Sequence, residues 1–175
     1  MSTDTQQAQS EPMFLYISTV RLVVLSIVSA GLYEAYWIYK NWRYLKERYG
    51  LKIRPFWRGI FGVFYCHSLL ERIHEDRDAR EVKVPGFAAR GLATGWVILT
   101  ILANIMGRLG ITASIIAAFI PSFLCLVPVQ KYVNSVTEKG SPGQKVYGWS
   151  AGHVVCVVFG LLVWGSILIS LTATR

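Results

Sequence analysis

Residues 31–50 read GLYEAYWIYKNWRYLKERYG, and this stretch decides the fold class. Tyrosine and tryptophan residues close an apolar segment, and a run of lysine and arginine residues follows them. Aromatic rings with one polar edge collect at headgroup depth in a bilayer, while cationic side chains collect on its cytoplasmic side. The stretch therefore predicts a membrane helix whose basic end lies in the cytoplasm. It carries no signature of a chemical reaction.

The composition of the whole chain agrees with a membrane protein. Of its 175 residues, 53% are hydrophobic and only 16% are charged, and the apolar residues occur in long blocks rather than in amphipathic half-faces. The net charge of +8 could suggest nucleic acid. However, lysine and arginine residues that flank membrane spans orient a protein and contact anionic lipid, so we expect no nucleic-acid partner.

The N-terminus and the cysteines add little chemistry. Residues 1–12 are polar and contain no lysine or arginine, so we expect a disordered tail without a secretory signal. A single membrane domain then covers residues 13–175. The three cysteines lie in apolar surroundings and form no CxxC pair, which is typical of small core residues rather than of a disulfide framework.

Four apolar blocks are long enough to cross a bilayer as helices. Ser18 and Thr19 are positioned to cap the first block, and its helix is expected to continue past the membrane to Gly50. The second and third blocks are joined by a short turn, so they form an antiparallel hairpin, and two prolines kink the third. A polar loop over residues 130–150 precedes the last block. The predicted spans are residues 20–39, 91–107, 111–129 and 151–173.

Residues 55–73 are predicted to form a further helix that does not cross. Their apolar part has only 15 residues, which is short for a span. Gly59, Gly62 and Cys66 fall on one side of this helix, and such small residues let another backbone approach closely. We expect an interfacial or half-inserted helix on the cytoplasmic side.

The distribution of cations favours four spans. Residues 40–90 contain 12 lysine and arginine residues and residues 131–150 contain 3, so 15 of 18 lie on one side if residues 55–73 do not cross. The positive-inside rule then puts both termini outside. The prediction is an all-α, multi-pass protein of a cell inner membrane, with four transmembrane helices, one interfacial helix and an N-out, C-out arrangement.

Four motifs resemble those of an uncharacterised family of small bacterial multi-span membrane proteins. They are GLYEAYWIYKNW at 31–42, PFWRGIF at 55–61, PVQKYVN at 128–134 and YGWSAGHVVCVVFGLLVW at 147–164. The first matches the family's Gly-x-Tyr-x-x-Tyr-Trp-x-Tyr pattern at the end of the first span, and the resemblance covers most of residues 14–170. It implies a bacterial inner membrane. The family's domain has no known function, so the resemblance implies no activity and no catalytic residue.

Glu34 is the acid that lies within a predicted span, which makes it the candidate functional acid. An ionisable residue at that depth is costly and is often functional, for example in proton handling. The simpler interpretation is a structural pairing with Lys40, Arg58 or a tyrosine hydroxyl, because Glu34 lies close to the predicted interface.

Basic and aromatic residues alternate after the first span and form a candidate surface for anionic lipid or a protein partner. Orientation of the protein alone would explain these charges. Contact with anionic headgroups is the functional alternative, because each lysine or arginine near such a surface gains about 1 kcal/mol. The residues of this predicted patch are Trp42, Arg43, Lys46, Arg48, Lys52, Arg54, Trp57 and Arg58.

The last span carries Gly152, Cys156 and Gly160 at four-residue spacing, which predicts a tight helix contact within the bundle or between copies. His153 shares a face with Cys156, but the paired histidines of a membrane dihaem protein are missing. No nucleotide loop, nucleophile elbow or zinc-protease helix occurs. We therefore expect no catalytic residue, no metal and no cofactor.

Two functions follow as hypotheses. The first is a non-enzymatic inner-membrane protein that acts through helix packing and its cytoplasmic basic patch, as an accessory, scaffold or lipid-contacting subunit. Its partners would be membrane lipids, a further membrane protein or copies of itself. The alternative is a small oligomeric transporter or channel, suggested by the prolines of the third span and by Glu34.

Overall fold

The computed structural model describes residues 13–110, 113, 116, 121–140 and 146–173. Every regular element in these ranges is a helix, as predicted. The predicted tail at residues 1–12 lies outside the described residues. So does most of the first part of the third predicted span (111–129), as far as residue 120.

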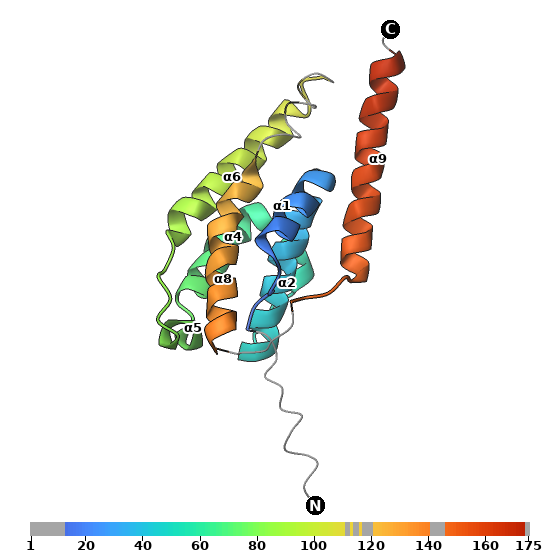
Figure 1. The fold of residues 1–175 in the computed structure, drawn as a ribbon. Helices are drawn as coiled ribbons and strands as arrows, with labels where there is room; N and C mark the ends of the chain where they lie inside the picture. Colours follow the sequence, from blue (N-terminus) through green and yellow to red (C-terminus); the bar gives the residue numbers. More distant parts are fainter. Residues whose placement is uncertain (1–12, 111–112, 114–115, 117–120, 141–145, 174–175) are drawn as a thin grey trace, which may run out of the picture.

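Two of the described helices are long and apolar enough to cross a membrane. They are α6 (Ala89–Met106) and α9 (Ala151–Ala173), close to the predicted spans 91–107 and 151–173. Only 17% of the hydrophobic window in each is buried, so most of the apolar surface of both helices is not covered by the rest of the described structure. In Figure 1 both helices extend beyond the others at the same end of the molecule.

The predicted span over residues 20–39 is wrong, because the chain turns back in the middle of it. Helix α1 (Thr19–Val28) is followed by α2 (Leu32–Tyr49), and the break includes Ala30 and Gly31 at φ of 48° and 89°. A left-handed backbone favours glycine, which has no Cβ to clash. The Ser18 side chain makes no capping bond, but α2 does end at Gly50 as predicted.

The reversal brings residues far apart in the sequence together. The Leu15 amide donates a hydrogen bond to Asn41 Oδ1 at 3.2 Å. In one continuous helix these two residues would be about 39 Å apart. Helices α1 and α2 therefore form a hairpin, whose turn lies beside the middle of α6 and α9 rather than at their far ends (Figure 1).

Side-chain amides from α8 and α2 hold the extended segment 13–17 that precedes the hairpin. Gln130 Nε2 donates to the Leu15 carbonyl at 2.9 Å, and Asn134 Nδ2 donates to the Ile17 carbonyl at 2.8 Å. Buried backbone groups need such partners when they are not in a helix. The side chains of Phe14, Leu15 and Ile17 are fully buried, so the segment belongs to the core.

This packing removes the basis for the predicted N-out arrangement. Arg48, at the basic end of α2, donates to the Met13 carbonyl at 3.5 Å. The described N-terminal segment therefore lies beside the basic end of α2, whereas a single span would have put the two on opposite sides of a bilayer.

A second reversal follows. The predicted helix over residues 55–73 is divided at Phe61 into α3 (Pro55–Ile60) and α4 (Gly62–His74). Helix α3 packs on α2, and α4 runs antiparallel to α6, with His67 Nε2 3.0 Å from Thr94 Oγ1. The short α5 (Arg77–Glu81) connects this region toward α6.

The described end of the third predicted span differs from the prediction. Pro121 precedes a 3₁₀ turn, η1 (Ser122–Cys125), and α8 (Leu126–Gly140) continues well past residue 129. Residues 130–140 are therefore helical and not part of a polar loop. The reason is that Val129, Val133 and Val136 are buried at helical spacing, which outweighs the polar residues between them.

Candidate functional site: a chamber at Glu34

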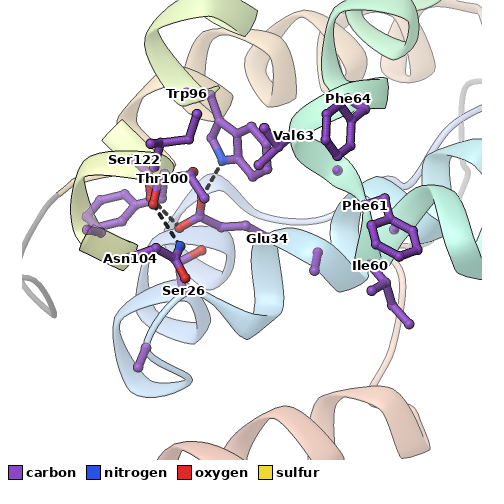
Figure 2. A pocket seen from close by; sticks show the side chains of 18 of the residues that line it. Ser26, Glu34, Ile60, Phe61, Val63, Phe64, Trp96, Thr100, Asn104 and Ser122 are labelled. Carbon is purple, nitrogen blue, oxygen red and sulfur yellow. Dashed lines mark hydrogen bonds between the residues drawn. The ribbon is translucent and has the colours of Figure 1, made fainter. Parts of the chain in front are cut away.

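A cavity of about 800 Å³ lies where the two reversals meet. Its lining comes from the turn of the α1–α2 hairpin, the α3–α4 joint, the C-terminal half of α6 and η1 (Figure 2). We call this cavity the Glu34 chamber. Because neither hairpin turn is predicted by the sequence, the chamber itself could not be predicted either.

Glu34 lies in the wall of the chamber and is only 3% exposed. Its Oε1 accepts a hydrogen bond from Ser122 Oγ at 2.9 Å, and its Oε2 accepts one from the indole N–H of Trp96 (Figure 2). Within the described ranges no ion pair involves Glu34. The expected pairing with Lys40, Arg58 or a tyrosine hydroxyl is thus replaced by two neutral donors.

The two expected cations have other contacts. Lys40 Nζ lies 4.6 Å from the ring centre of Tyr147, and the Arg58 guanidinium lies 4.2 Å from that of Trp42. Both are cation–π contacts, which attract a cation to the negative face of a ring. Among the described residues that line the chamber, Glu34 has the only carboxyl group, and no cation is bonded to it.

Two further hydroxyl groups in the chamber have no hydrogen-bond partner among the described residues. Ser26 Oγ, on a side chain that is 2% exposed, and Thr100 Oγ1 are both buried and unpaired. Buried polar atoms are nearly always paired, so unpaired ones in a cavity need an explanation. The opposite walls are apolar and include Ile60, Phe61 and Phe64 (Figure 2).

The predicted basic and aromatic patch does not form one surface. Trp42 is fully buried, with Arg58 on its ring. Arg48 forms an ion pair with the buried carboxylate of Asp76, which also accepts a hydrogen bond from the Tyr49 hydroxyl at 2.8 Å. Burial lowers the pKa of Arg58. These patch members hold helices together instead of facing lipid.

The other patch residues are exposed. Arg43 pairs with Glu47 on the surface of α2, and Lys46 lies beside them in the sequence. Further along, two cations are followed directly by large apolar side chains that the fold leaves uncovered. We call this set the elbow: Lys52, Arg54, Phe56, Trp57, Ile60, Phe61 and Phe64.

The predicted small residues lie at close helix contacts. A Cβ added to Gly59 would be 2.6 Å from Tyr39 Cβ, and one added to Gly62 would be 2.9 Å from Ile38 Cδ1. On α9, a Cβ at Gly152 would overlap the Tyr36 ring, and one at Gly160 would overlap the Val28 carbonyl. Cys66 and Cys156 are both buried.

His153 belongs to a polar cluster between α9 and α2. Its Nδ1 accepts a hydrogen bond from the Ser150 amide at 3.2 Å, and its Nε2 lies 3.3 Å from the Tyr33 hydroxyl. The accepting Nδ1 leaves Nε2 to carry the proton of the neutral ring. The Tyr36 hydroxyl lies 3.0 Å from Ser150 Oγ, which extends the cluster. These contacts explain why a histidine is placed in an otherwise apolar helix.

Comparisons with protein-family models, with curated proteins and with solved structures gave no match. The resemblance to a small bacterial membrane-protein family stays a prediction.

Proposed function

We propose that the protein is a non-enzymatic inner-membrane protein, anchored by α6 and α9, that contacts anionic lipid through the elbow and serves as an accessory or scaffold subunit. The observation that carries the proposal is the order of exposed side chains in the elbow. Lys52 and Arg54 come first, the indole of Trp57 follows, and Phe61 and Phe64 lie beyond it. Cations at headgroup depth, an aromatic ring at the interface and phenyl rings in the hydrocarbon reproduce the layers of a bilayer.

The close contact between α3 and α2 supports a fixed elbow. Because Gly59 has no side chain, α3 lies directly against Ala35 and Tyr39, and its opposite face is turned outward. Exposed apolar side chains of this size are unfavourable in water and favourable in lipid. The nearby exposed cations add attraction to anionic headgroups, which salt screens.

The test measures which lipid the protein prefers. In reconstituted vesicles, spin-labelled phosphatidylglycerol is expected to be immobilised by the protein more than spin-labelled phosphatidylcholine, and high salt should reduce the difference. The double variant Lys52→Gln, Arg54→Gln is expected to lose most of the preference. The control, Lys131→Gln with Lys139→Gln, removes two exposed cations of α8 and should keep it. Equal immobilisation of both lipids by the wild type would refute the proposal.

The alternative of a transporter or channel draws its support from the Glu34 chamber. Binding in the chamber comes before any flux, and it is the subject of the next subsection.

A further inference from the structure

The Glu34 chamber is built from interrupted helices. The breaks at Gly31 and Phe61 belong to different hairpins, yet both line the same cavity. With α6 across a bilayer, these breaks lie inside the hydrocarbon layer, where non-helical backbone is tolerated when it is buried in protein or lines a cavity. Meeting ends of interrupted helices are a recurrent way to form a binding site near the middle of a membrane.

Among the described residues no cation forms an ion pair with the carboxylate of Glu34. Glu34 accepts hydrogen bonds from Trp96 and Ser122, and both donors are neutral. A carboxylate has room for about four hydrogen bonds, so acceptor capacity is left over. A carboxylate removed from water and from cations is costly, and a bound cation would offset that cost.

The unpaired hydroxyls indicate the shape of the cation's charged group. Ser26 and Thr100 line the chamber with Glu34, and their hydroxyl groups have no partner in the part of the chain that the structure describes. A primary ammonium has three N–H donors. The carboxylate and the two hydroxyl oxygens together offer three acceptors, which matches an ammonium and gives each orphaned hydroxyl a partner.

The rest of the chamber indicates an apolar body. Its wall along α6 runs from Trp96 to Ile105, about 14 Å of helix, with Ile101 between them. Arg108 also lines the chamber; it is exposed and lies beyond the C-terminal end of α6, whereas Trp96, which bonds Glu34, lies in the middle of that helix. The volume of about 800 Å³ lies within the range of small-molecule sites.

We propose that the chamber binds a primary organic ammonium with an apolar chain. The ammonium lies at Glu34, Ser26 and Thr100, and the chain lies between α6 and the hairpin turns. This binding requires no transport. The chamber and the elbow share Ile60, Phe61 and Phe64, but the elbow's cations Lys52 and Arg54 do not line the chamber. The amine can come from a free amphipathic molecule or from the headgroup of an aminophospholipid.

The probe for the test is n-octylammonium, with n-octanol and n-octanoate as comparators of the same chain length. Binding is followed by tryptophan fluorescence, because Trp96 donates to Glu34, with the protein in phosphatidylcholine nanodiscs. Two variants are compared. Glu34→Gln removes the charge in the chamber, and Glu47→Gln makes the same change at an exposed position of the same helix.

Octylammonium is expected to saturate a site in the wild type and in Glu47→Gln, and to bind Glu34→Gln roughly ten- to a hundredfold more weakly. Thr100→Val should weaken binding less. Octanol and octanoate should not saturate the site. Equal binding of all three probes by the wild type would overturn the proposal without any variant, and so would unchanged binding of octylammonium by folded Glu34→Gln.

A second set of nanodiscs separates the two sources of the amine. Where phosphatidylethanolamine replaces part of the phosphatidylcholine, competition with octylammonium supports a lipid headgroup as the ligand. Undiminished octylammonium binding supports a free amine.

Discussion

The α1–α2 hairpin and α9 have similar apolar segments in the sequence, yet only α9 is a continuous helix. Helix α9 contains Gly152, Gly160 and Gly165 and still runs unbroken over Ala151–Ala173. The segment 20–39 contains one glycine and turns back there. The comparison shows that apolar length decides what is able to cross a membrane. Whether such a segment forms one continuous helix is decided by its turn residues and by the buried polar groups that bond to it.

Local chemistry explains the difference. At the break, Ser29 Oγ accepts a hydrogen bond from the Tyr33 amide at 2.8 Å, which gives one N–H of the first turn of α2 a partner from before the helix. Glu34 follows in that first turn, where an acidic residue is favoured by the helix dipole. No such start signal interrupts α9, whose glycines either contact the hairpin or, at Gly165, have open space around them.

The largest effect is expected where the two regions touch. In Gly160→Ala the new methyl group would overlap the Val28 carbonyl, and backbone cannot move aside as a side chain can. We expect the free energy of unfolding to fall by about 3 kcal/mol. Gly165→Ala, with nothing within 4 Å of its Cβ, should change it by less than about 0.5 kcal/mol. Denaturant unfolding in detergent measures both, and equal effects would show that α9 does not pack on the hairpin.

The next effect concerns the polar contacts that hold the hairpin. Gln130 Oε1 accepts from the Trp37 indole at 2.6 Å, and Gln130 Nε2 donates to the Leu15 carbonyl. Gln130→Leu leaves both groups buried and unpaired, so we expect a loss of about 2 kcal/mol and faster hydrogen exchange at residues 14–17. Ser135→Ala on the same helix is the control. Unchanged exchange in Gln130→Leu would mean that the amide does not hold the segment.

The smallest effect is the change in stability caused by replacing Gly31, and its sign distinguishes a hairpin from a single helix. Gly31 has a φ of 89°, so Gly31→Ala should destabilise the protein by about 1 kcal/mol. If residues 20–39 were a single helix, the same change would stabilise it by about 0.5–1 kcal/mol. Gly148→Ala, outside any helix and with open space at its Cβ, is the control for glycine replacement. A rise in the melting temperature of Gly31→Ala would contradict the hairpin.

Part of this architecture could be predicted from the sequence. The all-helical fold, α6, α9 and the end of α2 at Gly50 follow from hydropathy, length and a C-terminal glycine. The hairpin could not, because its determinants act over long distance. Asn41 and Gln130 appear in the sequence as ordinary polar residues, and only the fold brings them to the backbone of residues 15–17. Ser29 followed by Gly31 is the local signal that was available for the break.

The candidate site divides in the same way. Glu34 was identified from its depth in an apolar segment, but its partners Trp96 and Ser122 are 62 and 88 residues away. The patch was identified by composition alone, and composition does not separate the buried Trp42 and the half-buried Arg48 from the exposed Lys52 and Arg54.

The sidedness of the N-terminus tests the central claim most directly. In a variant with Cys66, Cys125 and Cys156 replaced by alanine, single cysteines are placed before Met1, at Lys52 and at Thr172, and each is labelled in vesicles with a membrane-impermeant maleimide. The hairpin predicts that the N-terminal cysteine and Lys52→Cys react from the same side and Thr172→Cys from the other. Labelling of the N-terminal cysteine from the side opposite Lys52→Cys would show that residues 20–39 cross the membrane, and would contradict the account.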